Sequence, residues 1–187
     1  MLSYLSDYND TFPTVHPGPE SWIYWGSGWD VSQSPIGCYL QGINTNLFRC
    51  PKDTRFSESE QTQTSGSNYP RFPFSYSLSW GIGTFGHGSP GMASQSLYSN
   101  GRFEAFKLGM VKTPVRKIMF AEDEFPITNS LSLFVGPFLN SSGFIWNYGD
   151  HLTDRHKGRG NVFFADGHSE TVQRAYGDQL EHTNPLE

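Results

Sequence analysis

Charge is the first thing that this sequence of 187 residues lacks. Charged residues make up 17% of the chain, against roughly 25% in an average globular protein, and the net charge is −5 at pH 7. Nucleic acids and anionic membrane surfaces attract basic proteins, so an acidic chain with few cations disfavours both as partners. The sequence also has no apolar run near the ~20 residues of a membrane-spanning helix, and no secretory signal peptide. The length suits a single domain over residues 1–187, large enough to bury a core.

Cysteine is scarce too, with only Cys38 and Cys50. In an oxidising compartment these two could close a short loop worth roughly 3 kcal/mol; the alternative is two buried free thiols. The chain has no P-loop and no Gly-x-Ser-x-Gly motif. The string from Gly81 to Gly86 matches a dinucleotide-binding pattern, but a Pro-Gly loop rather than a helix follows it. We therefore predict no catalytic residues, and the protein is not expected to be an enzyme.

What the sequence does contain is a loop-rich pattern of short elements with many aromatic residues. Helical spacing at Leu2, Tyr4, Leu5 and Tyr8 predicts the last turns of a helix whose beginning lies upstream of residue 1. Helices are expected early and strands late, which favours an α+β fold with a mostly antiparallel sheet and long loops. The predicted helical segments are 1–8, a helix from Ser34-Pro35 with an apolar face to Ile43, and helical turns at 103–107 and 174–180. The predicted strands are 74–80, with its serines facing solvent, and 116–121, 131–135 and 144–148; a mobile loop is expected at 54–69.

The clearest local signal is a β-hairpin within residues 156–172. Asn161 to Ala165 is an apolar run, Asp166-Gly167 is a turn dipeptide, and a return strand follows. A two-residue turn needs positive φ at both central residues, which Gly adopts freely and Asp tolerates. Nine residues separate His156 from Asp166.

Polar residues around this hairpin leave several kinds of site open. Imidazole and carboxylate groups could hold a transition metal and so form a metal-dependent hydrolase, although their spacing matches no known helical ligand pair. Calcium is an alternative, because loop carboxylates are hard oxygen donors. The candidate residues are Asp150, His151, Asp154, His156, Asp166 and His168, with Glu122-Asp123-Glu124 as a second acidic group that otherwise reads as a solvated strand end.

Two further functions remain open from the residues alone. A carboxylate pair such as Glu122 with Asp166 could serve glycoside hydrolysis if the fold brings the two together. Trp22, Trp25 and Trp29 could stack on sugars in a carbohydrate- or surface-binding module, although such residues more often cover the edge of a core.

Several motifs in chain order resemble one family. His156, nine residues and then Asp166-Gly167, within Arg155-His156 to His168, is similar to the prepilin-type His-x(9)-Asp-Gly domain that closes many pseudopilin-like proteins of the type II secretion and type IV pilus class. The other matching segments are Tyr8 to Pro13, where the long N-terminal helix of the family ends; Leu47-Phe-Arg-Cys-Pro-Lys-Asp53; Ser75-Tyr76-Ser77-Leu78, with Ser79 where Asn is usual; and Ile118-Met-Phe-Ala-Glu122.

This resemblance implies a pilin-like fold, with a long hydrophobic helix packed on the sheet. It implies a non-catalytic subunit of a secretion pseudopilus or pilus, located in the cell envelope. A segment preceding residue 1 would anchor it in the inner membrane and join it to other subunits. The globular part displayed in the periplasm or outside would be monomeric. Independently of the resemblance, Leu186-Glu187 is interpreted as a cloning remnant. An envelope location predicts a Cys38–Cys50 disulfide. No cofactor is expected, although calcium binding in related major pseudopilins keeps that ion open. For His156, Asp166 and Gly167 we expect a structural role, with His156 or Asp166 bonded to loop backbone at the base of the hairpin.

Overall fold

The computed structural model describes residues 1–15, 21–24, 30–40, 45–53, 74–79, 91–97, 102–124, 143–144, 151–177 and 179–186. The predicted loop at 54–69 and strand at 131–135, together with Trp25, Trp29 and Asp150, lie outside this part of the chain. The α-helices are short: α1 (Leu2–Asp7), α2 (Arg174–Gly177) and α3 (Leu180–Thr183). The 3-10 helices are η1 (Val31–Gln33), η2 (Gly37–Tyr39), η3 (Thr45–Phe48), η4 (Leu108–Met110) and η5 (Pro114–Arg116). The strands are β1 (Tyr76–Ser79), β2 (Gln95–Leu97), β3 (Arg102–Glu104), β4 (Ile118–Glu124), β5 (Gly143–Phe144), β6 (His151–Leu152), β7 (Arg159–Phe164) and β8 (Ser169–Gln173).

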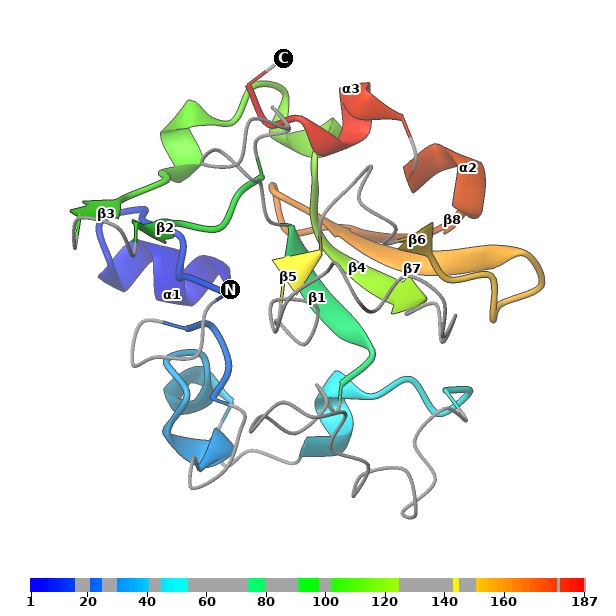
Figure 1. The fold of residues 1–187 in the computed structure, drawn as a ribbon, viewed down its shortest axis with the longest axis horizontal. Coiled ribbons are helices and arrows are strands. Elements are labelled where there is room, and N and C mark those ends of the chain that lie inside the picture. Colours follow the sequence, from blue (N-terminus) through cyan, green and yellow to red (C-terminus); the bar gives the residue numbers. More distant parts are fainter. Residues whose placement is uncertain are drawn as a thin grey trace.

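One sheet organises the structure, with β4 near its centre. The strand order is β5-β1-β4-β7-β8, and β6 pairs with the end of β4. Every pair in this sheet is antiparallel except β1 with β5. The small β2–β3 pair lies beside α1 at the left of Figure 1, and the loop that leads into β7 lies at the right. The predicted α+β class with a mostly antiparallel sheet is therefore confirmed. None of the described helices is long and apolar enough to cross a lipid bilayer.

Apolar side chains form two hydrophobic clusters around β4. Met119 and Phe120 belong to the larger cluster, together with residues of α1 and β1. Ile118 and Ala121 belong to a smaller cluster formed with β6, β7 and β8. This arrangement explains why the prediction that the serines of strand 74–80 face solvent is wrong. Ser77 is 1% exposed and Ser79 is 2% exposed, because β1 is covered on both faces.

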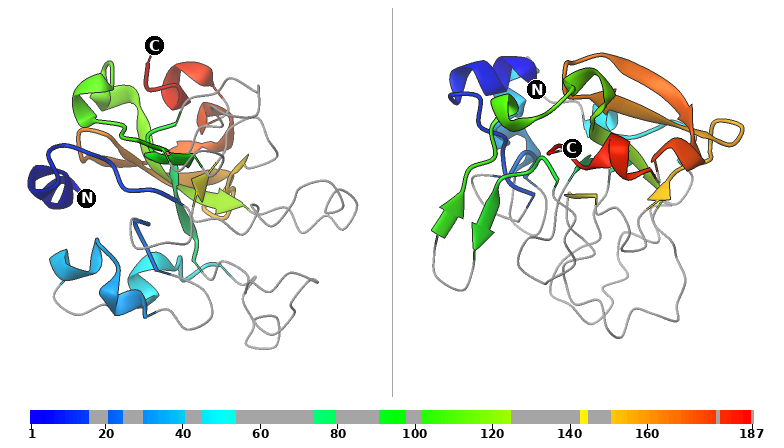
Figure 2. Two further views of the ribbon diagram at one scale, coloured as in Figure 1. Left: turned by 60° about the vertical axis from the view of Figure 1, so that its left-hand side comes forward. Right: turned by 90° about the horizontal axis from the view of Figure 1, so that it is seen from above.

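The N-terminal helix lies against this core, as predicted for residues 1–8. Tyr4 and Leu5 are buried in the larger cluster, whereas Leu2 and Tyr8 are half exposed. The two views in Figure 2 show α1 beside the sheet. The helix ends at Asp7 and is followed by Asn9 and Asp10, both with positive φ. Asparagine and aspartate tolerate this left-handed conformation better than other side chains, so the predicted end of the helix is confirmed.

The predicted hairpin is also confirmed, but its turn is different. β7 pairs with β8 from Arg159–Gln173 to Phe163–Ser169. Within the turn between the two strands, only Gly167 has positive φ, at 96°. The Gly167 N–H donates to the Phe164 carbonyl, and the Phe164 N–H donates to the His168 carbonyl, each over 2.9 Å. These bonds close a three-residue loop in which glycine takes the left-handed position after an ordinary turn. The expected two-residue turn with positive φ at both central residues is wrong.

Two helical predictions fail for local reasons. The segment after Ser34-Pro35 forms only the 3-10 turn η2 as far as the structure describes it. The hydroxyl of Ser34 is used on the preceding chain: it donates to the Val31 carbonyl at 2.6 Å and accepts from the Tyr24 N–H at 2.7 Å. It therefore caps no following helix. At 103–107 the predicted helical turn is replaced by the end of β3 and an irregular segment, whereas the turns predicted at 174–180 are present as α2 and the start of α3.

Candidate functional site around the buried carboxylate of Glu122

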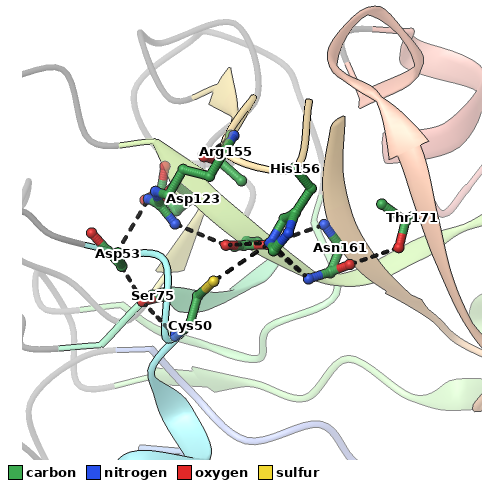
Figure 3. Close-up of polar contacts among 10 residues, drawn as sticks. Cys50, Asp53, Ser75, Asp123, Arg155, His156, Asn161 and Thr171 are labelled. Atoms are coloured by element: carbon green, nitrogen blue, oxygen red, sulfur yellow. Dashed lines mark hydrogen bonds and ion pairs between the residues drawn. The ribbon is translucent and has the colours of Figure 1, made fainter. Parts of the chain in front are cut away.

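The carboxylate of Glu122 lies at the centre of the largest described polar network. Strand β4 places Glu122 opposite Tyr76 of β1, and β7 flanks β4 on its other edge. The side chain of Glu122 is fully buried, with 0% exposure. A carboxylate in such a place is very costly unless it is paired or hydrogen-bonded, so its partners determine what the site can do. Figure 3 shows Arg155, His156 and Asn161 pointing toward one another around this carboxylate.

Arg155 supplies the positive charge. Its Nη1 donates to Oε1 of Glu122 at 2.9 Å, and its Nη2 lies 3.3 Å from Oδ2 of Asp53. Nη2 also donates to the backbone carbonyl of Asp123 at 2.5 Å. The side chains of Arg155 and Asp53 are 12% and 1% exposed. One guanidinium therefore bridges two buried carboxylates that come from positions 69 residues apart in the sequence, and its planar fork of donors suits this geometry.

His156 and Asn161 complete the contacts of the carboxylate. Nε2 of His156 lies 2.9 Å from Oε2 of Glu122 and 3.2 Å from Oε1. Asn161 donates to Oε2 from both its backbone N–H, at 3.2 Å, and its Nδ2, at 2.9 Å. The Thr171 hydroxyl holds the amide of Asn161 by donating to its Oδ1 at 2.8 Å. The carboxylate thus ties β4 to the loop before β7, to β7 itself and, through Thr171, to β8.

Cys50 approaches the same place from the turn after η3. Its Sγ is 3.4 Å from Nε2 of His156. The Ser75 hydroxyl accepts the Cys50 N–H at 3.0 Å and donates to Oδ2 of Asp53 at 2.7 Å (Figure 3). The backbone of Ser75 bonds to the Phe48 carbonyl and to the Asp123 N–H. An open hollow of about 390 Å³ borders this turn; it is lined by Asn46, Arg49, Cys50, Pro51, Asp53 and Ser75.

The electrostatics of the site favour neutral forms beside Glu122. Burial, with a smaller contribution from the Glu122 carboxylate, raises the pKa of the Cys50 thiol above its usual value. Burial first and Glu122 second also raise the pKa of Tyr76. A nucleophilic cysteine needs the opposite environment, one that lowers its pKa and exposes the thiolate. The surroundings of Cys50 in this structure therefore favour the neutral thiol.

The structure divides the predicted polar cluster. Asp166 and His168 pair with each other in the exposed hairpin turn: Oδ1 of Asp166 lies 2.5 Å from Nδ1 of His168 and accepts the His168 N–H at 3.2 Å. The side chain of His156 contacts Glu122. Of the two residues expected to bond to loop backbone, Asp166 does so, through the His168 N–H in the turn and not at the base of the hairpin. Among the described residues, the single group of three potential ligands that lie together is Cys50, Glu122 and His156. The predicted sites that combine His156 with Asp166 and His168 are not formed, and Glu122 is not a solvated strand end.

Two other predictions are corrected at this stage. Cys50 is a buried free thiol in this structure, so the expected disulfide to Cys38 is not formed; the side chain of Cys38 lies outside the described part. Trp22 is 1% exposed and packs edge-on against Phe48 and Phe120. It is part of the core and cannot stack on a sugar.

The residue patterns alone did not identify Arg155, Asn161, Asp53 or Ser75 as functional. The sequence feature that could have identified them is the set of segments that resemble the pseudopilin family. Apart from Tyr8–Pro13, each of these segments contributes at least one residue to the network around Glu122. Comparison of the chain with protein-family models, with curated proteins and with solved structures finds no match.

Proposed function

We propose that this chain is the globular domain of a pseudopilin-like subunit, a non-catalytic structural component of a type II secretion or type IV pilus-like assembly. The pilin-like character of its fold is part of this proposal. Assembly with other subunits, and anchoring in the inner membrane, would use a hydrophobic helix preceding residue 1. The domain itself would stand in the periplasm or outside the cell.

The observation that supports the proposal most is the use that the fold makes of the family-like segments. The Cys50–Asp53 turn, Ser75, Glu122, the Arg155-His156 pair and Asn161 all meet at one buried carboxylate. Their polar atoms are engaged with one another, and the thiol among them has a raised pKa. A network of this kind suits a scaffold, which is what a subunit that acts by assembly requires, and this supports the non-catalytic part of the proposal.

The N-terminal helix gives a second line of support. Tyr4 and Leu5 of α1 are buried in the core, and Leu2 lies over the hairpin turn at Gly167. In a pilin-like subunit, the globular domain holds the end of the long helix by contacts of this kind. An exposed apolar Trp surface, which would favour a surface-binding module, finds no support from Trp22.

The test is the full-length gene and its product. Upstream of residue 1 we expect a short basic leader, a processing site and ~20 apolar residues, enough to span a bilayer. The expressed full-length protein should sediment with membranes and resist extraction by alkaline carbonate, whereas the chain of residues 1–187 should be soluble and monomeric by light scattering. A cleavable secretory signal ending just before Met1, or an upstream region without an apolar helix, would overturn the proposal and favour surface binding.

A separate comparison addresses the enzyme alternative. His156→Ala should lower the stability of the domain by roughly 1 kcal/mol or more, because the Glu122 carboxylate loses a hydrogen bond in a buried place. His168→Phe, which removes the imidazole of the hairpin turn but keeps an aromatic ring stacked on Phe164, is the matched control and should change stability little. Loss of a hydrolytic activity in His156→Ala with unchanged stability would instead establish a catalytic site.

A further inference from the structure

The nitrogen Nε2 of His156 has more polar neighbours than an imidazole nitrogen can serve. It lies 3.4 Å from Sγ of Cys50, 2.9 and 3.2 Å from the two oxygens of Glu122, and 3.1 Å from Nδ2 of Asn161. A ring nitrogen offers either one hydrogen or one lone pair, so it can make one good hydrogen bond among these. A thiol, a carboxylate and an imidazole gathered on one point are, however, the donors that a metal ion collects.

The spacing of these donors fits an ion of ordinary size. The ligand atoms of Cys50, Glu122 and His156 all lie within 4.8 Å of one another. Around a tetrahedral ion with bonds of about 2.0–2.3 Å, neighbouring donors stand about 3.3–3.8 Å apart. The separation of Sγ and Nε2, 3.4 Å, is already in this range, and that of Nε2 and Oε2, 2.9 Å, needs to open by only a few tenths of an ångström.

The surroundings also match those of a metal centre. Metal-binding carboxylates and imidazoles are usually held in orientation by outer hydrogen bonds. Here Arg155 and Asn161 fix the Glu122 carboxylate, and Arg155 is balanced in turn by Asp53, 3.3 Å away. The hollow borders Cys50, and the His156 side chain is 22% exposed, so two of the three ligands lie near solvent.

We propose that Cys50, Glu122 and His156 form a binding site for one divalent transition-metal ion of the zinc class. Thiolate and imidazole ligands select such ions over calcium, which prefers oxygen donors alone. On binding, the Cys50 thiol releases its proton to solvent and the sulfur bonds to the ion. The thiolate and the Glu122 carboxylate together neutralise the charge of the ion, and water completes the coordination. The ion would clamp the Cys50 turn, β4 and the loop before β7. This site shares Glu122 with the second acidic group considered for calcium, but its thiol and imidazole ligands suit a different ion, and it does not depend on the role in assembly.

The test is titration of the 187-residue chain, in a Cys38→Ser background, with Co²⁺ as the spectroscopic probe. One equivalent should produce the visible bands of a low-symmetry, four-coordinate ion and a thiolate-to-cobalt charge-transfer band in the near ultraviolet. Excess Zn²⁺ should abolish both. Cys50→Ser should remove the charge-transfer band, and His156→Gln should weaken Co²⁺ binding at least tenfold. The control His168→Gln, which alters the exposed His–Asp pair of the hairpin turn, should bind Co²⁺ as the parent does.

A second measurement covers variants that fold poorly. Because an ion that binds only the folded state raises its stability by mass action, Zn²⁺ should raise the melting temperature of the parent and of His168→Gln. The rise should be absent in Cys50→Ser, whose folding is checked by circular dichroism without metal. The proposal is overturned by the absence of a thiolate band with Co²⁺, by a band that survives in Cys50→Ser, or by stabilisation with Ca²⁺ and not with Zn²⁺.

Discussion

Replacement of Arg155 by methionine is the sharpest perturbation of the polar network. Methionine keeps much of the length of the side chain and removes its charge. Two carboxylates, Glu122 with 0% exposure and Asp53 with 1%, then lose the cation between them. Removing one partner of a buried ion pair typically costs about 3–5 kcal/mol, because the remaining charge is left without compensation.

The separations in the structure support the upper part of that range. At 2.9 and 3.3 Å, and with an effective dielectric constant of ~20, each pair has a Coulomb energy of about 5–6 kcal/mol, which the desolvation of Arg155 partly offsets. Since the stability of a domain is only about 5–15 kcal/mol, Arg155→Met should remove a large part of it. For a chain of this length, a loss of about 3–5 kcal/mol corresponds to a fall of about 6–20 °C in melting temperature.

Urea denaturation followed by tryptophan fluorescence measures this loss of stability. The midpoint urea concentration should fall, while the slope of the unfolding free energy against urea concentration should not change. The matched control is Arg116→Met. Arg116 lies 3.9 Å from Glu181, but the two side chains are 61% and 60% exposed, so the control should cost less than about 1 kcal/mol. Arg155→Lys should fall between the two variants, because an ammonium group cannot bridge both carboxylates with a planar fork. Equal midpoints for Arg155→Met and Arg116→Met would refute the reasoning.

Three further predictions concern other parts of the fold. Gly160→Ala should destabilise by about 1–3 kcal/mol in urea denaturation, because a Cβ there would stand 2.7 Å from side-chain carbons of Leu152 and 2.8 Å from the Thr153 carbonyl oxygen; an unchanged midpoint would show that β6 can move away. Gly158→Ala should cost roughly 1 kcal/mol, because it places a side chain at positive φ where nothing else lies within 4 Å. Gly167→Ala should cost more than this, because its Cβ would also stand 2.6 Å from Leu2 of α1. That excess should vanish in a Leu2→Ala background, and its persistence there would contradict the contact between α1 and the hairpin. Burial, the largest cause, lowers the pKa of His182 in the folded state. The unfolded chain therefore binds the proton more strongly, and stability that is present above about pH 6.5 should be lost as the pH falls through the folded pKa. Thermal melts of His182→Gln should lack this part of the pH dependence, and identical pH profiles for variant and parent would argue against the prediction.

Secondary-structure elements that depend on residues close together in the chain could be predicted from the sequence. The hairpin of β7 and β8 follows from an apolar run, a turn dipeptide and an alternating return strand, all within residues 159–173. The end of α1 follows from Asn9 and Asp10, whose side chains tolerate the left-handed conformation. The turn type was not predictable with the same certainty, because an Asp-Gly pair suits both a two-residue turn and a three-residue loop that places only Gly167 at positive φ.

The burial of polar strand residues could not be predicted from alternation alone. The serines of β1 alternate with Tyr76 and Leu78, a pattern that normally indicates one solvated face. Whether that face meets water depends on what the rest of the chain places against it, and here both faces are covered. Glu122 shows the same limit more strongly, since an acidic residue at the end of an apolar strand normally reaches solvent. Its burial becomes acceptable only because Arg155, 33 residues later, arrives to compensate it.

By itself, then, the sequence determined the α+β class, the mostly antiparallel sheet, the hairpin and the end of the first helix, because local propensity and turn chemistry act over a few residues. Only the tertiary structure decided that Cys50 faces His156 as a free thiol, that His156 bonds to Glu122 and not to the hairpin loop, and that Asp166 and His168 stay apart from them. These contacts join positions up to 106 residues apart. The physical reason is that a buried charge selects its partners by their distance and orientation in the folded chain, and neither quantity is contained in the spacing of residues along it.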